Sequence, residues 1–183
     1  GLLVMRSYVL AGNAAHYDGV IAAFEARGLR VVPAFASGLD ARPAVDKYFV
    51  RNGKPQVDAV VSLTGFSLVG GPAYNDAKAA EDMLAALDVP YVAALPVEFQ
   101  TLEQWRTSDR GLMPVEATMM VAIPELDGAT GAMVFGGRSA TTSGTRTRDM
   151  HTEDERATML AARVDRLIAL RRTERAARKV AVV

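Results

Sequence analysis

The sequence predicts an α/β fold, in which a mostly parallel sheet is flanked by helices as in flavodoxin-like or Rossmann-like domains. Two observations predict this class. Short apolar runs alternate with amphipathic segments, and turn residues separate the two kinds of segment. Half of the residues are hydrophobic, which suffices for a sizeable core. Strands that alternate with helices imply parallel pairing, because each crossover helix covers a face of the sheet.

The expected strands are apolar runs bounded by turn residues. The carboxyl ends of parallel strands meet at one edge of a sheet, and such sheets bind their ligands at that edge. We therefore expect the loops that follow the first four strands to share one rim. The expected strands are residues 2–10, 29–35, 57–63, 89–95 and 132–135.

Helical spacing and capping residues define the helices of the first half. Tyr17, Val20 and Phe24 fall on one stripe of the first helix, and Gly28 stands where a left-handed C-terminal cap belongs. The third helix has an acidic start, which its dipole favours. The expected helices are residues 14–27, 44–50 and 76–87.

The half of the chain after the fourth strand is predicted to be less regular. Thr101 opens a capping box with the glutamine three residues later, which predicts a short helix. Pro114 suits the first position of another short helix, and Pro124 is expected to stop it. A last helix is expected after a second capping box formed by Thr152 and Glu155.

We expect one α/β domain over residues 1–150. Its β/α units are regular up to about residue 95, and residues 96–150 form an irregular part that carries the site. Residues 151–183 are expected to form a helix and the start of a strand that leads into the next domain of a longer protein. This expectation rests on the two ends of the sequence, which both look like interrupted strands.

Composition excludes several classes of function. Lysine plus arginine equals aspartate plus glutamate at 21 each, so no net charge attracts nucleic acid or an anionic membrane. The chain contains no cysteine, which excludes a disulfide framework, a thiolate metal site and a cysteine nucleophile. No apolar run approaches the roughly 20 residues of a transmembrane helix.

A glycine-rich segment, residues 64–72, follows the third strand and precedes a helix, as a phosphate-binding loop does. Gly65 and Gly70 have the spacing of such a loop, but Gly71 and Pro72 stand where the lysine and the hydroxyl residue belong. The missing side chains favour a tight loop that needs positive φ at its glycines over a nucleotide site.

The apolar side chains of the same segment are unusual for a solvated loop. They belong to Phe66, Leu68 and Val69. Such side chains suit packing against another domain or against a flat apolar ligand. We therefore expect this segment to line the ligand rim.

Residues 123–128 place two carboxylates, Glu125 and Asp127, two positions apart after Pro124. In one interpretation Asp127 and Gly128 form a turn and Glu125 is a surface acid. In the other, an extended backbone turns both carboxylates to the same side. The apolar neighbours would then raise their pKa, so that they accept a proton near neutral pH, and their oxygens are ligands that Mg²⁺ takes.

The two histidines, His16 and His151, are far apart and have no metal-ligand spacing. His16 follows the first strand, so we expect it on the ligand rim, although a capping or surface role is the simpler interpretation. His151 precedes the last helix and is interpreted as structural. A basic run from Arg171 to Lys179 lacks interleaved aromatic residues, which favours a solvated face over an RNA site.

Several segments, in order and over essentially the whole chain, resemble the large (H) subunit family of magnesium chelatase. The sequence of residues 12–19 and 74–76 is more similar to the bacteriochlorophyll branch of that family than to the plant and cyanobacterial branch. The family is related to the large subunit of cobaltochelatase. The segments that carry the resemblance are residues 12–19, 35–40, 60–73, 90–105, 121–128 and 134–138.

The resemblance implies a much longer, multidomain protein that binds protoporphyrin IX and is the catalytic subunit for ATP-dependent insertion of Mg²⁺. Two smaller subunits would form the ATPase ring that drives it. We expect a cytoplasmic protein, or one at the periphery of photosynthetic membranes, and we expect this chain alone to be inactive. The partners would be porphyrin, the two smaller subunits and the other domains of the same subunit, with no nucleic acid and no transmembrane segment.

The resemblance also implies roles for particular residues and favours a functional interpretation of residues 123–128. Glu125 and Asp127 would be catalytic and would bind Mg²⁺. Glu98 departs from the apolar residue expected in plant-type relatives and receives no catalytic role. The residues expected to bind the porphyrin are His16, Phe66, Leu68, Gly70, Gly71 and Arg138.

Two alternatives to an enzyme fragment stay open at this stage. The chain could be a non-catalytic scaffold or docking domain of the same subunit. It could also be a free-standing, flavodoxin-like ligand-binding domain, although the interrupted strands at both ends argue against this. The surroundings of Glu125 and Asp127 separate these possibilities, because a catalytic pair should face an enclosed cavity and a surface turn should face solvent.

Overall fold

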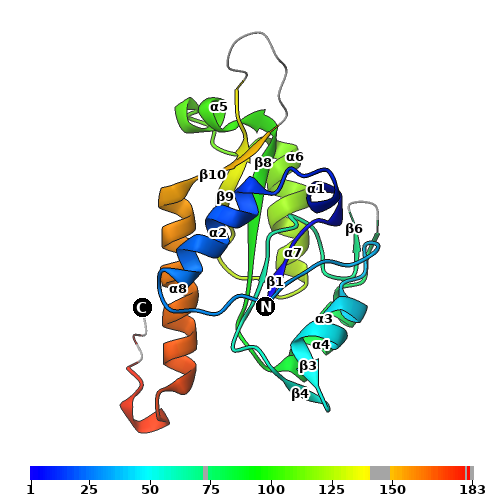
Figure 1. The fold of residues 1–183 in the computed structure, drawn as a ribbon, viewed down its shortest axis with the longest axis vertical. Helices are drawn as coiled ribbons and strands as arrows, with labels where there is room; N and C mark the ends of the chain where they lie inside the picture. Colours follow the sequence, from blue (N-terminus) through cyan, green and yellow to red (C-terminus); the bar gives the residue numbers. More distant parts are fainter. Residues whose placement is uncertain (72–73, 141–148, 180, 182–183) are drawn as a thin grey trace.

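A six-stranded sheet forms the centre of the described part of the chain (Figure 1). The computed structural model describes residues 1–71, 74–140, 149–179 and 181. All neighbouring strands are parallel except β10, which pairs antiparallel with β9. In spatial order the strands are β10 (Met150–Thr152), β9 (Met133–Arg138), β8 (Tyr91–Thr101), β5 (Val60–Ser62), β1 (Leu2–Leu3) and β2 (Pro33–Ala34).

The order of the parallel strands confirms the predicted fold class. With two small hairpins set aside, the strands β2, β1, β5, β8 and β9 follow the order 2-1-3-4-5 of flavodoxin-like folds. The chain reverses its direction of winding between β1 and β5, and such a switch point opens a crevice at the carboxyl ends of the strands. The two hairpins are β3 (Val50–Arg51) with β4 (Lys54–Pro55), and β6 (Gly70–Gly71) with β7 (Tyr74–Asn75).

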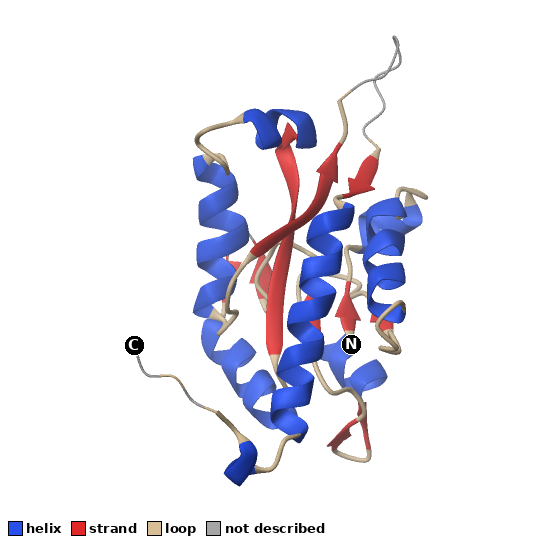
Figure 2. Cartoon of the chain, turned by 90° about the vertical axis from the view of Figure 1, so that its left-hand side faces the viewer, coloured by secondary structure: helices blue, strands red, loops and turns tan. Residues whose placement is uncertain are grey.

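Helices cover both faces of the sheet, as Figure 2 shows. Successive strand residues point to opposite faces, so Leu2 and Val61 pack against α2 and α8, whereas Leu3 and Val60 pack against α3 and α4. A third cluster around Leu95 lies between the end of β8 and the helices that follow it. The helices named here are α2 (Ala15–Glu25), α3 (Arg42–Phe49), α4 (Ala77–Leu87) and α8 (Asp154–Arg172).

Capping residues begin several helices where the sequence predicted them. The Asp76 side chain accepts a hydrogen bond from the Ala79 amide at 3.0 Å and caps α4. Both bonds of the capping box between Thr101 and Gln104 are present at the start of α5 (Leu102–Thr107). These bonds satisfy backbone amides that the first turn of a helix leaves without partners.

The expectation of a strand over residues 2–10 is wrong beyond Leu3. The Met5 amide donates to the Tyr17 hydroxyl at 3.1 Å instead of extending the ladder, and the chain turns into α1 (Arg6–Leu10). A short apolar run does not distinguish a strand from a helix, which explains the error. The rim after the first strand therefore begins at Val4.

The expected strand over residues 89–95 is real but extends to Thr101, well past the end of its neighbour β5. The upper half of β8 pairs with β9 instead, whose Gly137 lies against the backbone of Val97. Glycine permits this close approach because it has no Cβ. Residues 96–101 thus stand above the rest of the sheet, at its carboxyl end.

Pro124 does not stop a helix, contrary to the expectation. The helical segment continues through α6 (Pro114–Glu116), a π-helical turn η1 (Ala117–Ala122) and α7 (Ile123–Leu126). A proline in a regular helix clashes with the carbonyl four residues earlier and lacks an amide donor. The wider π turn that precedes Pro124 relieves this conflict, and such turns occur frequently at functional sites.

The second expected capping box, Thr152 with Glu155, is also wrong. Thr152 belongs to β10, and its hydroxyl donates to the carbonyls of Ala15 and His16, both at 3.1 Å, so that it joins β10 to α2. Strand β10 and α8 pack on the same sheet as the first half of the chain. The strand expected to start at the chain's end falls mostly outside the described residues. None of the helices in the described ranges is long and apolar enough to span a bilayer.

Leu160 and Met159 provide a direct test of how α8 packs. Leu160 is fully buried in the core beneath α8, whereas its neighbour Met159 is exposed. We predict that Leu160→Ala lowers the free energy of unfolding by about 2–5 kcal/mol, because it leaves a cavity. Met159→Ala should change it by no more than about 0.5 kcal/mol. Urea unfolding of both variants checks this, and equal effects would contradict the described packing.

Candidate functional site

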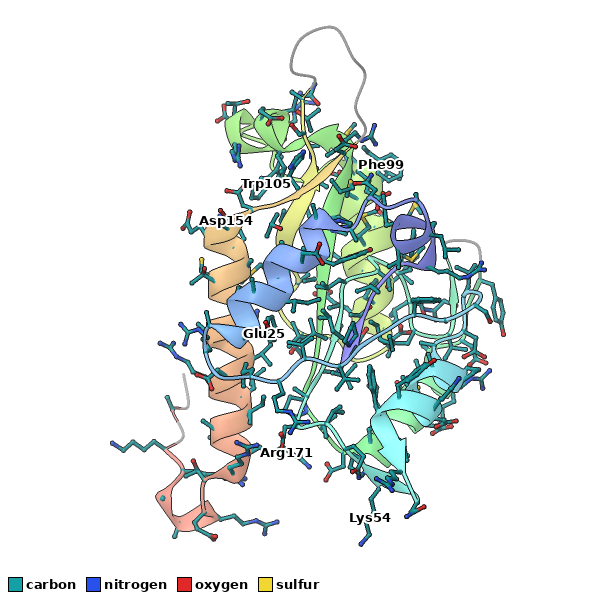
Figure 3. The ribbon with its side chains drawn as sticks, viewed as in Figure 1. Glu25, Lys54, Phe99, Trp105, Asp154 and Arg171 are labelled. Carbon is teal, nitrogen blue, oxygen red and sulfur yellow. The ribbon has the colours of Figure 1, made fainter. Side chains whose placement is uncertain are left out.

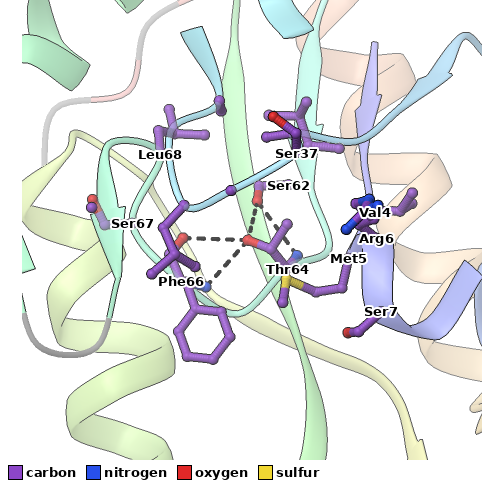
Figure 4. Close-up of a pocket in the computed structure, with 16 residues that line it drawn as sticks. Val4, Met5, Arg6, Ser7, Ser37, Ser62, Thr64, Phe66, Ser67 and Leu68 are labelled. Atoms are coloured by element: carbon purple, nitrogen blue, oxygen red, sulfur yellow. Dashed lines mark hydrogen bonds between the residues drawn. The ribbon is translucent and has the colours of Figure 1, made fainter. Parts of the chain in front are cut away.

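A cavity of about 260 Å³ lies at the switch point between β1 and β5 (Figure 4). Residues Val4–Ser7, which follow β1, form one side of it, and residues Phe66–Leu68 lie opposite. We call the segments that follow β1, β2 and β5, together with residues 96–101 of β8, the carboxyl rim. The predicted meeting of these loops at one edge is confirmed for the first three. The cavity is lined by Leu3, Val4, Met5, Arg6, Ser7, Ala36, Ser37, Gly38, Leu39, Ala41, Ser62, Thr64, Phe66, Ser67, Leu68 and Gly70.

Asp127 fixes the glycine-rich segment on which this cavity depends. Its fully buried carboxylate accepts hydrogen bonds from the Leu68 amide at 2.7 Å, the Ser67 hydroxyl at 3.0 Å and the Asn75 side-chain amide at 3.2 Å. A carboxylate that accepts several hydrogen bonds tolerates burial that an unpaired charge does not. Asp127 therefore joins the end of α7 to both sides of the β6–β7 hairpin.

The glycine-rich segment is a tight loop, as its missing phosphate-binding side chains predicted. Gly65 and Gly70 have φ values of +69° and +111°. A Cβ on Gly70 would collide with the Tyr74 carbonyl, and one on Gly71 with the Leu39 side chain. Only glycine meets both demands at Gly70, since it has free access to positive φ and no Cβ.

Hydroxyl groups organise the floor of the cavity. The Ser62 and Thr64 hydroxyls lie 2.9 Å apart in a hydrogen bond, and the Phe66 amide donates to Thr64 Oγ1 at 3.3 Å (Figure 4). These hydrogen bonds form a turn over residues 62–66, directly after β5. This turn exposes Thr64 to the cavity while Ser62 stays buried.

Glu125 and Asp127 do not form the side-by-side pair expected from an extended backbone. Glu125 lies in α7, and Asp127 is the residue that ends it, with helical φ and ψ of −76° and −7°. In helical geometry residues two apart point in roughly opposite directions, since each residue advances about 100°. Glu125 is consequently exposed and Asp127 is buried. No group of three or more histidine, aspartate or glutamate side chains within the described ranges could hold a metal ion.

A second polar cluster joins α1 to the upper part of β8. Tyr8 of α1 hydrogen-bonds Glu98 of β8, and Arg138 at the end of β9 faces both. Burial raises the pKa of Glu98 above its usual range, the nearby Glu116 raises it further, and the Tyr8 hydrogen bond and Arg138 oppose these effects. Burial also raises the pKa of Tyr8, so its phenol stays protonated.

Glu116 is a fully buried carboxylate that sequence reasoning missed. It accepts hydrogen bonds from the Phe99 amide at 3.2 Å, the Gln100 side chain at 2.6 Å and the Met113 amide at 2.9 Å. It therefore fixes the start of α6 against the end of β8. Its spacing of three residues from Met113 is that of a capping box, but methionine hides the pattern because it has no capping oxygen.

His16 was expected on the rim but lies beneath it. Its ring is fully buried and stacks against Tyr17 and Phe135, with the edge of Tyr8 above it. Neither ring nitrogen has a hydrogen-bond partner in the described structure. Burial lowers the pKa of His16 to about 4, and His151 lowers it in the same direction, so the ring is neutral at pH 7. In this chain His16 supports α1 from below and does not reach the cavity.

The structure places the predicted binding residues at several different positions and not around one cavity. Phe66, Leu68 and Gly70 line one cavity, as expected. Arg138 belongs to the cluster with Tyr8 and Glu98, and Glu98 lies in the part of β8 that extends to the carboxyl edge. Gly71 lies buried beside the cavity wall and His16 lies below the rim.

The strand order and the cavity at the switch point define a flavodoxin-like α/β domain with a cavity at its carboxyl edge. The chain belongs to the CobN/magnesium chelatase family, whose family model matches residues 1–183. The resemblance found in the sequence is thereby confirmed.

Individual relatives agree with this assignment. The whole chain is 54% identical to the magnesium-chelatase H subunit of Cereibacter sphaeroides and covers 16% of that protein. It is 44% identical to the chloroplastic magnesium-chelatase protein ChlH of Oryza sativa and covers 13% of it. The catalytic subunit of cobaltochelatase from Mycobacterium tuberculosis has the same fold, with a TM-score of 0.73 and 27% identity over 94% of this chain and 14% of that one. The chain therefore spans 13–16% of the length of these two curated relatives.

Asp127 and Glu125 are a matched pair for testing the loop anchor. Asp127→Asn should lower the free energy of unfolding by about 1–3 kcal/mol, because an amide group would face donors that the carboxylate now satisfies. Glu125→Gln, on the exposed side of the same turn, should stay within about 0.5 kcal/mol of the parent chain. Urea unfolding measures both, and an unchanged Asp127→Asn stability would show that the anchor is not needed.

Burial of neutral His16 predicts a loss of stability in acid. The unfolded chain binds a proton at His16 below pH 6.5, whereas the folded chain resists doing so until about pH 4. Stability contributed by this residue is thus present above pH 6.5 and is lost as the pH falls to about 4, by about 3 kcal/mol in total. Unfolding measured at pH 7 and pH 4 should show a smaller difference in His16→Phe than in the parent chain. Equal differences in the two chains would refute the assignment.

Proposed function

We propose that this chain is a segment of the porphyrin-binding catalytic subunit of a magnesium chelatase, which inserts Mg²⁺ into protoporphyrin IX during (bacterio)chlorophyll synthesis. ATP would be hydrolysed by two smaller partner subunits in the cytoplasm. The observation that carries this proposal is the 54% identity of the entire chain to a magnesium-chelatase H subunit. Since the chain spans 16% of that protein, chelation would require the other domains.

The distribution of exposed apolar side chains supports a binding role for the carboxyl rim. Phe99 stands half exposed where β8 ends, near the top of Figure 3. Large apolar side chains left in water at one region mark a surface that another molecule or domain covers. A flat macrocycle offers such an apolar face. The exposed apolar residues on and beside the rim are Val9, Leu10, Phe35, Leu39, Tyr74, Phe99 and Met113.

The size of the cavity limits how much of the porphyrin this chain contacts. Pockets that enclose a whole ligand measure roughly 300–1,000 Å³, and the cavity at the switch point measures about 260 Å³. It is too small to enclose a tetrapyrrole. The macrocycle would therefore lie against the rim and be covered by other parts of the longer subunit.

The chemistry of metalation gives Glu125 a role that Asp127 does not share. Insertion of the metal removes two pyrrole protons, and hydrated Mg²⁺ releases water reluctantly. We assign the exposed Glu125 carboxylate as the base or as a transient ligand of the Mg²⁺ substrate. The oxygens of Asp127 already accept three hydrogen bonds, so Asp127 would act by positioning the rim and the end of α7.

One observation favours a non-catalytic docking domain as the second candidate. The described residues hold Glu125 on an exposed turn and not in an enclosed cavity. In a docking domain the exposed apolar residues of the rim would pack against a neighbouring domain and not against a porphyrin. The two candidates differ in whether the loss of one carboxylate removes the chemistry.

Glu125→Gln in the full-length subunit, assayed with both partner subunits, separates the candidates. We predict that porphyrin binding, followed by quenching of protein fluorescence, is unchanged. The chelation rate should fall about 100-fold or more, as is typical when a proton-transferring group is removed. Glu81→Gln, at an exposed position on α4, serves as the control. A Glu125→Gln subunit that chelates at the parent rate would favour the docking domain.

A further inference from the structure

The cavity at the switch point has walls that suit a short aliphatic chain. Leu3 and Leu68 are buried side chains of the second core cluster, and Leu39 and Phe66 complete an apolar lining. A ligand without apolar groups would gain no binding free energy from contact with these walls. At about 260 Å³ the cavity accepts a substituent of a larger molecule and not the molecule itself.

Polar side chains line the same cavity beside its apolar walls. The hydroxyls of Ser7, Ser37 and Thr64 line it, and hydroxyl groups donate hydrogen bonds to anionic oxygens. Arg6 also lines the cavity and is exposed, so its side chain can turn toward a ligand there without first leaving the core. The combination of apolar walls, hydroxyl groups and an arginine around one small cavity suits a carboxylate at the end of a short hydrocarbon chain.

Arg6 is free to pair with a ligand in a way that Arg138 is not. None of the ion pairs within the described residues involves Arg6. Arg138 is also absent from these ion pairs, but it lies near enough to the Glu98 carboxylate to lower the pKa of that group. An arginine without an acidic neighbour keeps its full capacity for the paired hydrogen bonds that guanidinium forms with a carboxylate.

We propose that this cavity binds a propionate side chain of the porphyrin, with Arg6 pairing with the carboxylate and the apolar walls contacting the methylene groups. This inference rests on the proposed function, because protoporphyrin IX is the ligand that carries the propionates. It gives the rim a defined orientation: one propionate edge of the macrocycle enters the switch point, and the ring lies outward from it. Arg6 is thus a specificity residue for the substrate's acid groups and not a participant in metalation.

The test compares protoporphyrin IX with its dimethyl ester in the full-length subunit, because the ester keeps the macrocycle and removes both carboxylates. Arg6→Gln should weaken binding of protoporphyrin IX about tenfold, which is the loss of one charge-assisted pair. It should leave binding of the dimethyl ester unchanged. Arg6→Lys should recover part of the affinity for the free acid, since it restores the charge without the planar fork.

A matched control separates a local effect from a change in overall charge. Arg51 is exposed in the β3–β4 hairpin, away from the carboxyl rim, and Arg51→Gln should change neither affinity. Equal losses for acid and ester in Arg6→Gln, or no loss for either, would overturn the propionate site. If the parent subunit binds neither porphyrin, the proposed function itself is wrong. Failure of the propionate site alone therefore gives a different result from failure of the proposed function.

Discussion

The rest of the structure depends on the three hydrogen bonds that the buried Asp127 carboxylate accepts from the segment after β5. They join residues about 60 positions apart and place the end of a helix against a glycine-rich loop. Without them the Leu68 amide and the Ser67 hydroxyl would lose their acceptor in the core, at a cost of about 1–3 kcal/mol for each unsatisfied group. The cavity wall formed by residues Phe66–Leu68 exists because this anchor holds it.

Asp127 and Glu125 are close in sequence, but their side chains lie in different surroundings. Asp127 faces inward, and Glu125, two residues earlier in a helical turn, faces out. The π turn before Pro124 lets the helix reach this point without a break. The buried Asp127 carboxylate therefore fixes the loop, whereas in the proposed function the exposed Glu125 carboxylate takes part in metalation. This division suits a rim against which a large flat substrate is held while the remaining domains cover it.

Much of the fold could be predicted from the sequence, whereas less of the site could be. Alternating apolar runs and helical stripes give the parallel sheet, and Asp76 and Thr101 mark helix starts because capping acts locally. The wrong predictions concern residues whose partners lie far away in the sequence. The strand β1 ends early because the Met5 amide donates to the Tyr17 hydroxyl. Thr152 does not cap α8 because its hydroxyl donates to a carbonyl of α2. Glu116 was missed for the same reason, since only the folded chain brings Phe99 and Gln100 to it. The interactions of Glu98 with Tyr8 and Arg138 also depend on the folded chain.

The most direct measurement is a structure of the full-length subunit with protoporphyrin IX bound. We predict that the macrocycle lies against the carboxyl rim, with a propionate at Arg6 and with the Glu125 carboxylate facing the ring. We also predict that Asp127 keeps its hydrogen bonds to the glycine-rich loop in that complex. A porphyrin bound to other domains, with this rim packed against protein or open to solvent, would contradict this account.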